Sequence, residues 1–103
     1  MADTHINQHI IETIEKVEHP AIATTLLGLG ILRDIEVTSD GKVTLTMVLP
    51  FPNIPDNVRD YMVNSLAAAA KSAGGKLIKA NLAFMNEEER QNFITKEKQH
   101  WRG

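Results

Sequence analysis

Residues 42–55 have the sequence KVTLTMVLPFPNIP, which contains the clearest strand signal in the chain. From residue 43 to residue 49, apolar side chains occupy every second position, with threonines at 44 and 46, which is the period of a strand with one buried face. Prolines follow at positions 50, 52 and 55. Because proline has no amide proton for a sheet ladder, the strand is expected to end at Leu49 and to continue as a stiff loop.

Residues 31–37 predict a second strand upstream of the first, with Arg33 on the buried face near its open end. The segment 39–41, Ser-Asp-Gly, separates the two strands, and an Asp-Gly pair tolerates the positive φ angles of a tight turn. The two strands are therefore expected to pair as an antiparallel hairpin. The apolar residues expected on the buried face of the upstream strand are Ile31, Ile35 and Val37.

A helix and a third strand are predicted downstream of the proline loop. Apolar residues recur at helical spacing from Val58 to Ala73, and the glycines at 74 and 75 predict the end of that helix. Asn53 and Asp56 have the spacing of a helix-capping pair. Residues 76–84 then predict the third strand.

The two ends of the chain carry further helical patterns. Residues 5–17 predict an amphipathic helix, and a short helical turn is expected between residues 20 and 27. Asn86 and Glu89 have the spacing of a capping box, which predicts a last helix over about 86–101. The order α-β-β-α-β-α predicts an α+β fold, a small three-stranded sheet with helices on one face. We expect a single domain over residues 1–103 with a core over about 5–84.

Composition excludes several classes of function. The chain has 103 residues, a net charge of −2 and 43% hydrophobic residues, which is typical of one globular domain and argues against a nucleic-acid-binding surface. No cysteine is present, so the chain can form no disulfide and supply no thiolate to a metal or a substrate. No apolar run is long enough to span a membrane, and no secretory leader is recognisable. A cytoplasmic location is therefore expected.

Candidate catalytic and metal-binding groups do not converge in the sequence. His5 and His9 are four residues apart on a predicted helix with Glu12 nearby, but no fourth ligand is evident. Gly28 and Gly30 lack the spacing of a dinucleotide-binding loop, so a buried turn with unusual dihedral angles is expected there. We therefore expect no catalytic residue, no cofactor and no metal site. The alternatives are a small metal-dependent or acid–base enzyme that uses His5, His9 or His19, and a structural dimerisation domain.

The proline loop is the candidate partner-binding segment. Prolines restrict its backbone, so Phe51, Asn53 and Ile54 could be presented with little entropy left to lose on binding. An apolar side chain on such a loop either caps the core or anchors a partner, and the sequence leaves both interpretations open.

Three segments together resemble a known family. They are VEHPAI at 17–22, LGLGILRDIEV at 27–37 and VTLTMVLPFPNIP at 43–55. They resemble the SufT/PaaD-like iron–sulfur assembly domain, and most closely the N-terminal domain of Mrp/ApbC-type iron–sulfur carrier ATPases. The resemblance implies a small α+β domain that assists iron–sulfur protein maturation. It also implies a partner, which would be a P-loop carrier ATPase, a scaffold or a recipient apoprotein.

Members of that family often carry a D-P-E motif and a T-x-P-x-C-P motif, and this chain departs from both. His19 stands at the aspartate position and Ala21 at the glutamate position. Pro50 stands at the threonine position and Ile54 at the cysteine position. With an aliphatic side chain in place of the cysteine, the resemblance implies a scaffold or docking role without direct ligation of a cluster.

Overall fold

The computed structural model describes the backbone of residues 2–20 and 22–101 and the side chains of residues 7–20 and 22–101. The elements follow the predicted order, α1 (Ala2–Glu15), β1 (Leu32–Val37), β2 (Lys42–Leu49), α2 (Asp56–Ser72), β3 (Lys76–Phe84) and α3 (Glu87–His100). The α+β class is therefore confirmed. None of the described helices is long and apolar enough to cross a membrane.

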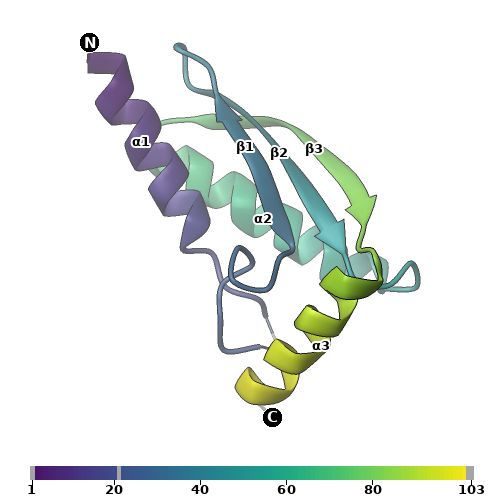
Figure 1. Ribbon diagram of the computed structural model, residues 1–103. Coiled ribbons are helices and arrows are strands. Elements are labelled where there is room, and N and C mark those ends of the chain that lie inside the picture. The colour runs from purple at the N-terminus through teal and green to yellow at the C-terminus, as the bar shows by residue number, and fades with distance from the viewer. Residues whose placement is uncertain (1, 21, 102–103) are drawn as a thin grey trace.

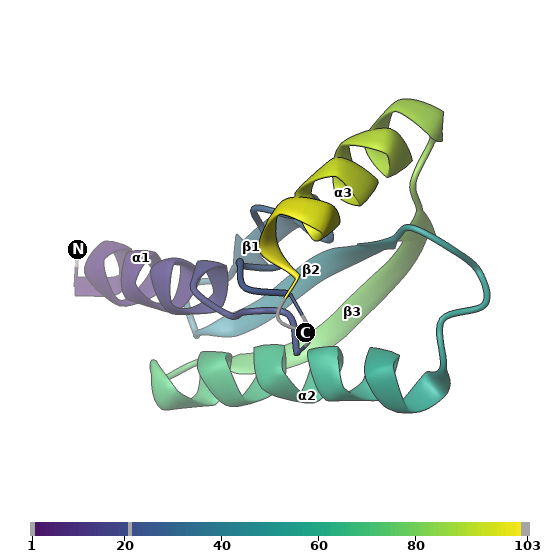
Figure 2. The same cartoon turned by 90° about the horizontal axis from the view of Figure 1, so that it is seen from below.

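The sheet has the strand order β1-β2-β3, with β1 antiparallel and β3 parallel to the central strand β2. Figure 1 shows α2 behind the sheet and α1 beside β1, and these two helices also contact each other. Helix α3 instead crosses the end of the sheet on the side away from α2 (Figure 2). The expectation of helices on one face therefore holds for α2 but not for α3, and this departure matters because α3 becomes one wall of a cavity.

The core lies between the central strand and the helices. The alternating residues of β2 that the sequence marked as inward are buried, and residues from all three helices close over them. This burial is the main stabilising term for a domain of this size. The side chains with the least exposed surface are Ile10, Ile14, Ile22, Leu26, Ile31, Leu32, Val43, Leu45, Met47, Val48, Met62 and Leu66.

The sequence predicted capping signals at three ends of α2 and α3, and the structure confirms two of them. Helix α2 ends in paired hydrogen bonds from Gly75 N–H to the Ala70 carbonyl and from Gly74 N–H to the Lys71 carbonyl, with Gly74 at φ +95°. Helix α3 begins with the predicted capping box between Asn86 and Glu89. The predicted cap at the start of α2 was wrong. Pro55 is the N-cap residue of α2, and the helix start has no side-chain cap bond.

A β-bulge in β1 corrects the predicted face of Arg33. Asp34 adopts φ +55°, and the register shifts between Arg33 and Glu36. The bulge inserts one extra residue, so the simple alternation of faces does not hold across it. Leu32 pairs with Met47 on the buried face, whereas Arg33 pairs with Thr46 on the other face. Arg33 reaches α3 from there, with its Nη1 atom 3.1 Å from Glu89 Oε2.

The segment after α1 forms loops and isolated bridges in place of the short helical turn expected between residues 20 and 27. Glu18 bridges Thr25, and Ile22 bridges Trp101 at the end of α3. In this segment the Leu26 N–H donates to the Val17 carbonyl and the His19 N–H to the Thr24 carbonyl, so these groups make long-range or loop bonds and not helical ones. Residue 21, the position matched to the family glutamate, lies outside the described residues.

The glycines of the following turn are only partly as predicted. Gly30 has φ +80°, as expected for an unusual dihedral, but it is exposed. Gly28 lies in a tight space, because an added Cβ atom would be 3.1 Å from the hydroxyl oxygens of Thr24 and Thr25. Glycine at 30 therefore suits the conformation of the turn, and a side chain at 28 would require the two threonine hydroxyl groups to shift by a few tenths of an ångström.

Candidate functional site

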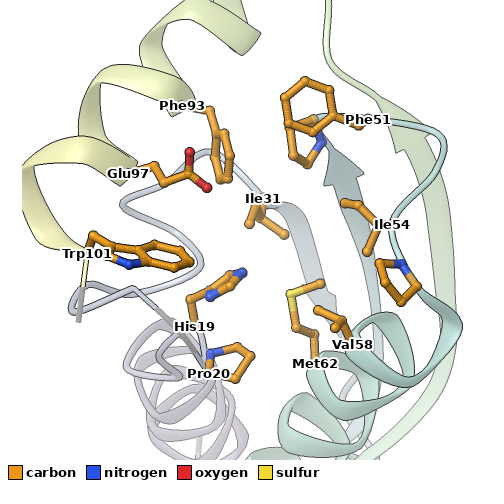
Figure 3. A pocket seen from close by; sticks show the side chains of 12 residues that line it. His19, Pro20, Ile31, Phe51, Ile54, Val58, Met62, Phe93, Glu97 and Trp101 are labelled. Carbon is orange, nitrogen blue, oxygen red and sulfur yellow. The ribbon is translucent and has the colours of Figure 1, made fainter. Parts of the chain in front are cut away.

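An open cavity of about 330 Å³ lies where α3, the proline loop and the segment after α1 meet. Figure 3 shows side chains from these three parts of the chain pointing toward one another around it. Its lining is almost entirely apolar, which is typical of a site that binds an apolar group. The lining residues are His19, Pro20, Ile31, Pro50, Phe51, Ile54, Pro55, Val58, Met62, Phe93, Glu97 and Trp101.

Three buried side chains form the floor of the cavity. Ile31 and Met62 each expose 1% of their surface and Phe93 exposes 3%. They come from the turn before β1, from α2 and from α3, and all three belong to the hydrophobic core. Because the floor is part of the packed core, its shape is fixed without any ligand.

Two aromatic side chains form the rim. Phe51 in the proline loop is 37% exposed, and Trp101 at the end of α3 is 56% exposed. Figure 3 shows them on opposite sides of the opening. Large aromatic side chains that remain exposed beside an apolar cavity are the residue type that most often anchors a protein partner.

His19 and Glu97 are the two ionisable side chains of the lining. The backbone N–H of His19 donates a hydrogen bond of 3.1 Å to the Thr24 carbonyl, which holds this part of the loop in place. Glu97 approaches from α3, and Figure 3 shows both side chains beside Trp101. The polar groups therefore lie at the Trp101 side of the cavity and can orient a ligand whose apolar part enters it.

Arg90 holds the proline loop against α3 and was not marked as important by the sequence. Its Nε atom donates to the Pro50 carbonyl at 2.9 Å and its Nη2 atom to the Met85 carbonyl at 3.3 Å, while Nη1 contacts Glu87 at 2.8 Å. The sequence shows the spacing of Arg90 from Glu87, but it does not show a contact with a carbonyl forty residues earlier. Arg90 is thus a positioning residue for the loop that carries Phe51.

The structure brings together most of the residues that the sequence singled out. Phe51 and Ile54 of the proline loop line the cavity together with His19, which lies far from them in the sequence. Ile54 is also half-buried and packs against the core. It therefore fits both interpretations of an apolar side chain on this loop, which are a cap on the core and an anchor for a partner. Asn53 is exposed and does not line the cavity. The contributions of Phe93, Glu97 and Trp101 were missed, because helical periodicity does not indicate which loop a helix will face.

Two of the histidines proposed for the alternative enzyme, His9 and His19, have described side chains, and they do not share a site. His9 is exposed on α1, and the Glu12 carboxylate accepts a hydrogen bond of 3.2 Å from Gln8. The side chain of His5 lies outside the described residues, and His19 is in the cavity. Within residues 7–20 and 22–101, no three His, Asp or Glu side chains lie close enough to hold a metal ion.

Comparisons with known proteins agree with the fold and the resemblance. Residues 7–80 match the sequence profile of a family described as "Iron-sulfur cluster assembly protein". A protein of Porphyromonas gingivalis named "Fe-S protein maturation auxiliary factor" is 31% identical over 81 residues, which are 78% of this chain and 75% of that protein. A crystal structure from Bacillus anthracis, titled as a domain of unknown function (DUF59), superposes with a TM-score of 0.60. That superposition covers 92% of this chain and 94% of the other at 15% sequence identity, so it supports the fold alone.

Proposed function

This chain belongs to the iron–sulfur cluster assembly protein family, and we propose that it is an auxiliary factor that docks on a partner protein through the cavity. The partner would be an iron–sulfur carrier ATPase, a scaffold or a recipient apoprotein. The single observation that carries the proposal is the convergence of His19 and Ile54 on one apolar cavity. These are the positions at which the resemblance places the aspartate and the cysteine of other family members.

The chemistry of the lining favours docking over direct handling of a cluster. Iron–sulfur clusters are held chiefly by thiolates, and this chain contains no cysteine. Ile54, at the position matched to the cysteine, offers apolar surface instead. A cluster that passes through the complex would therefore take its thiolate ligands from the partner, and the domain would act without catalytic residues of its own.

The cavity has the features of a protein-binding anchor site. Its floor belongs to the core, and the prolines at 50, 52 and 55 restrict the loop, so little conformational entropy remains to be lost on binding. The exposed rings of Phe51 and Trp101 lose water contact when an apolar side chain of the partner enters between them. The cavity volume of about 330 Å³ leaves room for a bulky side chain.

The proposal is tested by removing the rim aromatics and measuring binding to the P-loop iron–sulfur carrier ATPase of the same organism. Phe51→Ser and Trp101→Ser are preferred to changes at Ile54, because Ile54 also packs against the core. Tyr61→Ser is the matched control, since Tyr61 is a 55% exposed aromatic residue of α2 outside the cavity lining.

We expect each rim variant to weaken binding by about tenfold or more in isothermal titration calorimetry, and the Tyr61 control to bind as the wild type does. Circular dichroism should show all three variants folded. Equal binding by the rim variants and the control would overturn the cavity as the docking site.

A further inference from the structure

Glu97 is the one carboxylate in the lining of the cavity. It lies on α3, one helical turn after Phe93 and one before Trp101, and its side chain is half-buried. Glu87 and Glu89 in the first turn of the same helix each form an ion pair with an arginine. The Glu97 carboxylate, in contrast, forms no ion pair and no hydrogen bond with the described part of the chain.

The basic side chains closest to Glu97 in the sequence do not neutralise it. Lys96 donates from Nζ to a backbone carbonyl of the turn before β1 at 2.6 Å. Lys98 does not line the cavity, although it lines a second hollow together with Glu97 and Trp101. Neither lysine forms an ion pair with Glu97, and nor does His19 in the cavity lining. A positive charge for this carboxylate therefore has to come from outside the described chain.

A partner that closes the cavity removes water from Glu97 as well as from the apolar lining. Transfer of an ionised carboxylate from water to an apolar contact is strongly unfavourable unless an opposite charge or hydrogen-bond donors replace the water. Glu97 is already half-buried, so contact with a partner would complete its burial. The docking function proposed above therefore needs a positively charged group of the partner at this point.

Trp101 indicates which positive group fits best. Its indole is 56% exposed, and Figure 3 shows it on the same side of the cavity as the Glu97 side chain. A guanidinium group is planar, so it stacks on an aromatic ring and also donates two hydrogen bonds to one carboxylate. A lysine ammonium is a compact, strongly hydrated charge without that planar geometry. Arginine is therefore the side chain that uses both Glu97 and Trp101.

We propose that the partner binds through a segment in which an arginine lies next to a bulky apolar side chain. This inference rests on the docking function proposed above and adds the chemistry of the partner. The apolar side chain enters the cavity and contacts its floor of core residues. The guanidinium group stacks on Trp101 and pairs with Glu97, so Glu97 determines which partner segments are accepted.

A phage-displayed library of random short peptides tests the proposal without knowledge of the natural partner. The library is selected on the immobilised full chain and counter-selected on the Phe51→Ser variant, which keeps only the peptides that need the rim of the cavity. We expect these peptides to share an arginine next to a leucine, a methionine or an aromatic residue.

Reversal of the charges on both sides gives the quantitative test. A selected peptide without tryptophan, and its analogue with glutamate in place of the arginine, are titrated against the wild type and Glu97→Lys. Trp101 is the only tryptophan of the chain, so its fluorescence reports on occupation of the site. Glu97→Lys should weaken binding of the arginine peptide about tenfold and reverse the preference in favour of the glutamate analogue.

Two further variants serve as references. Glu97→Gln should remove the preference for arginine without creating one for glutamate. Glu88→Lys is the matched control, because Glu88 is an exposed residue of the same helix outside the cavity and the change in net charge is the same. It should change the affinity for either peptide by less than about twofold. Circular dichroism should show all variants folded.

The outcomes separate this inference from the docking function on which it rests. Rim-dependent peptides without a basic residue would overturn the arginine contact and leave the cavity as an apolar docking site. An arginine peptide that binds Glu97→Lys as tightly as the wild type would do the same. A selection that yields no rim-dependent peptide would also overturn the inference, whereas the docking function would still be decided by the binding of the carrier ATPase to the rim variants.

Discussion

Arg90 illustrates how single residues determine the site without lining it. Its guanidinium group joins the carbonyl that opens the proline loop to the carbonyl that precedes α3. Only a side chain with several fixed donors can satisfy two carbonyls and a carboxylate at once. The loop that carries Phe51 therefore owes its position to a residue that lies forty positions later in the chain.

Arg90→Gln is expected to lower the free energy of unfolding by about 1–2 kcal/mol, because it leaves the Pro50 carbonyl without its charged donor. The control is Arg59→Gln. Arg59 has a similar exposed fraction, 35% against 32% for Arg90, but its ion pairs are with Asp56 and Asp60 of its own helix. Such surface pairs contribute little, so the control should change stability by less than about 0.5 kcal/mol. Equal losses in urea unfolding of the two variants would contradict this role for Arg90.

Among the elements, the helix ends and strand faces that are indicated by residues close together in the sequence were predicted well. The alternation in β2, the two glycines after α2 and the capping box of α3 are all short-range patterns, and each is present in the structure. The bulge in β1 and the bridges after α1 depend on partners far along the chain, so local periodicity could not reveal them. Asn53 was predicted as a cap from its spacing to Asp56 alone, whereas Pro55 is the N-cap residue and α2 begins at Asp56.

Helix α3 is the element on which the cavity depends most, and its capping box gives a direct test. Asn86→Ala removes the side chain that accepts the Glu89 N–H at 2.8 Å. We expect a loss of about 1 kcal/mol, which corresponds to a melting temperature lower by about 4–8 °C in a domain of this size.

The loss of stability in the Asn86→Ala variant should originate at the start of α3. Amide hydrogen exchange should therefore become faster at Glu89 and Arg90 in the first turn of that helix. Asn92→Ala, at an exposed position within the same helix, serves as the control and should leave the melting temperature unchanged or slightly higher. A melting temperature that is unaffected in the Asn86 variant would mean that the cap does not stabilise α3.

For the molecule as a whole, the cavity is formed by three segments that lie far apart in the sequence. They are the loop after α1, the proline loop with the start of α2, and the second half of α3. The sequence identified Phe51 and Ile54 together on one loop and His19 separately, but it did not predict that His19 reaches the same cavity or that α3 completes the site. That convergence depends on α3 crossing the end of the sheet, which follows from long-range contacts such as those between Arg33 and Glu89 and between Lys96 and the Gly28 carbonyl.

The most direct test of the docking account is a two-dimensional ¹⁵N–¹H NMR titration of the labelled domain with the unlabelled carrier ATPase of the same organism. The account predicts that the strongest changes occur at the amides of His19, Phe51 and Ile54 and at the indole N–H of Trp101. The amides of α1 and of the open face of β3 should change little. Saturable binding that leaves the cavity signals in place and shifts those of α1 or β3 instead would contradict it.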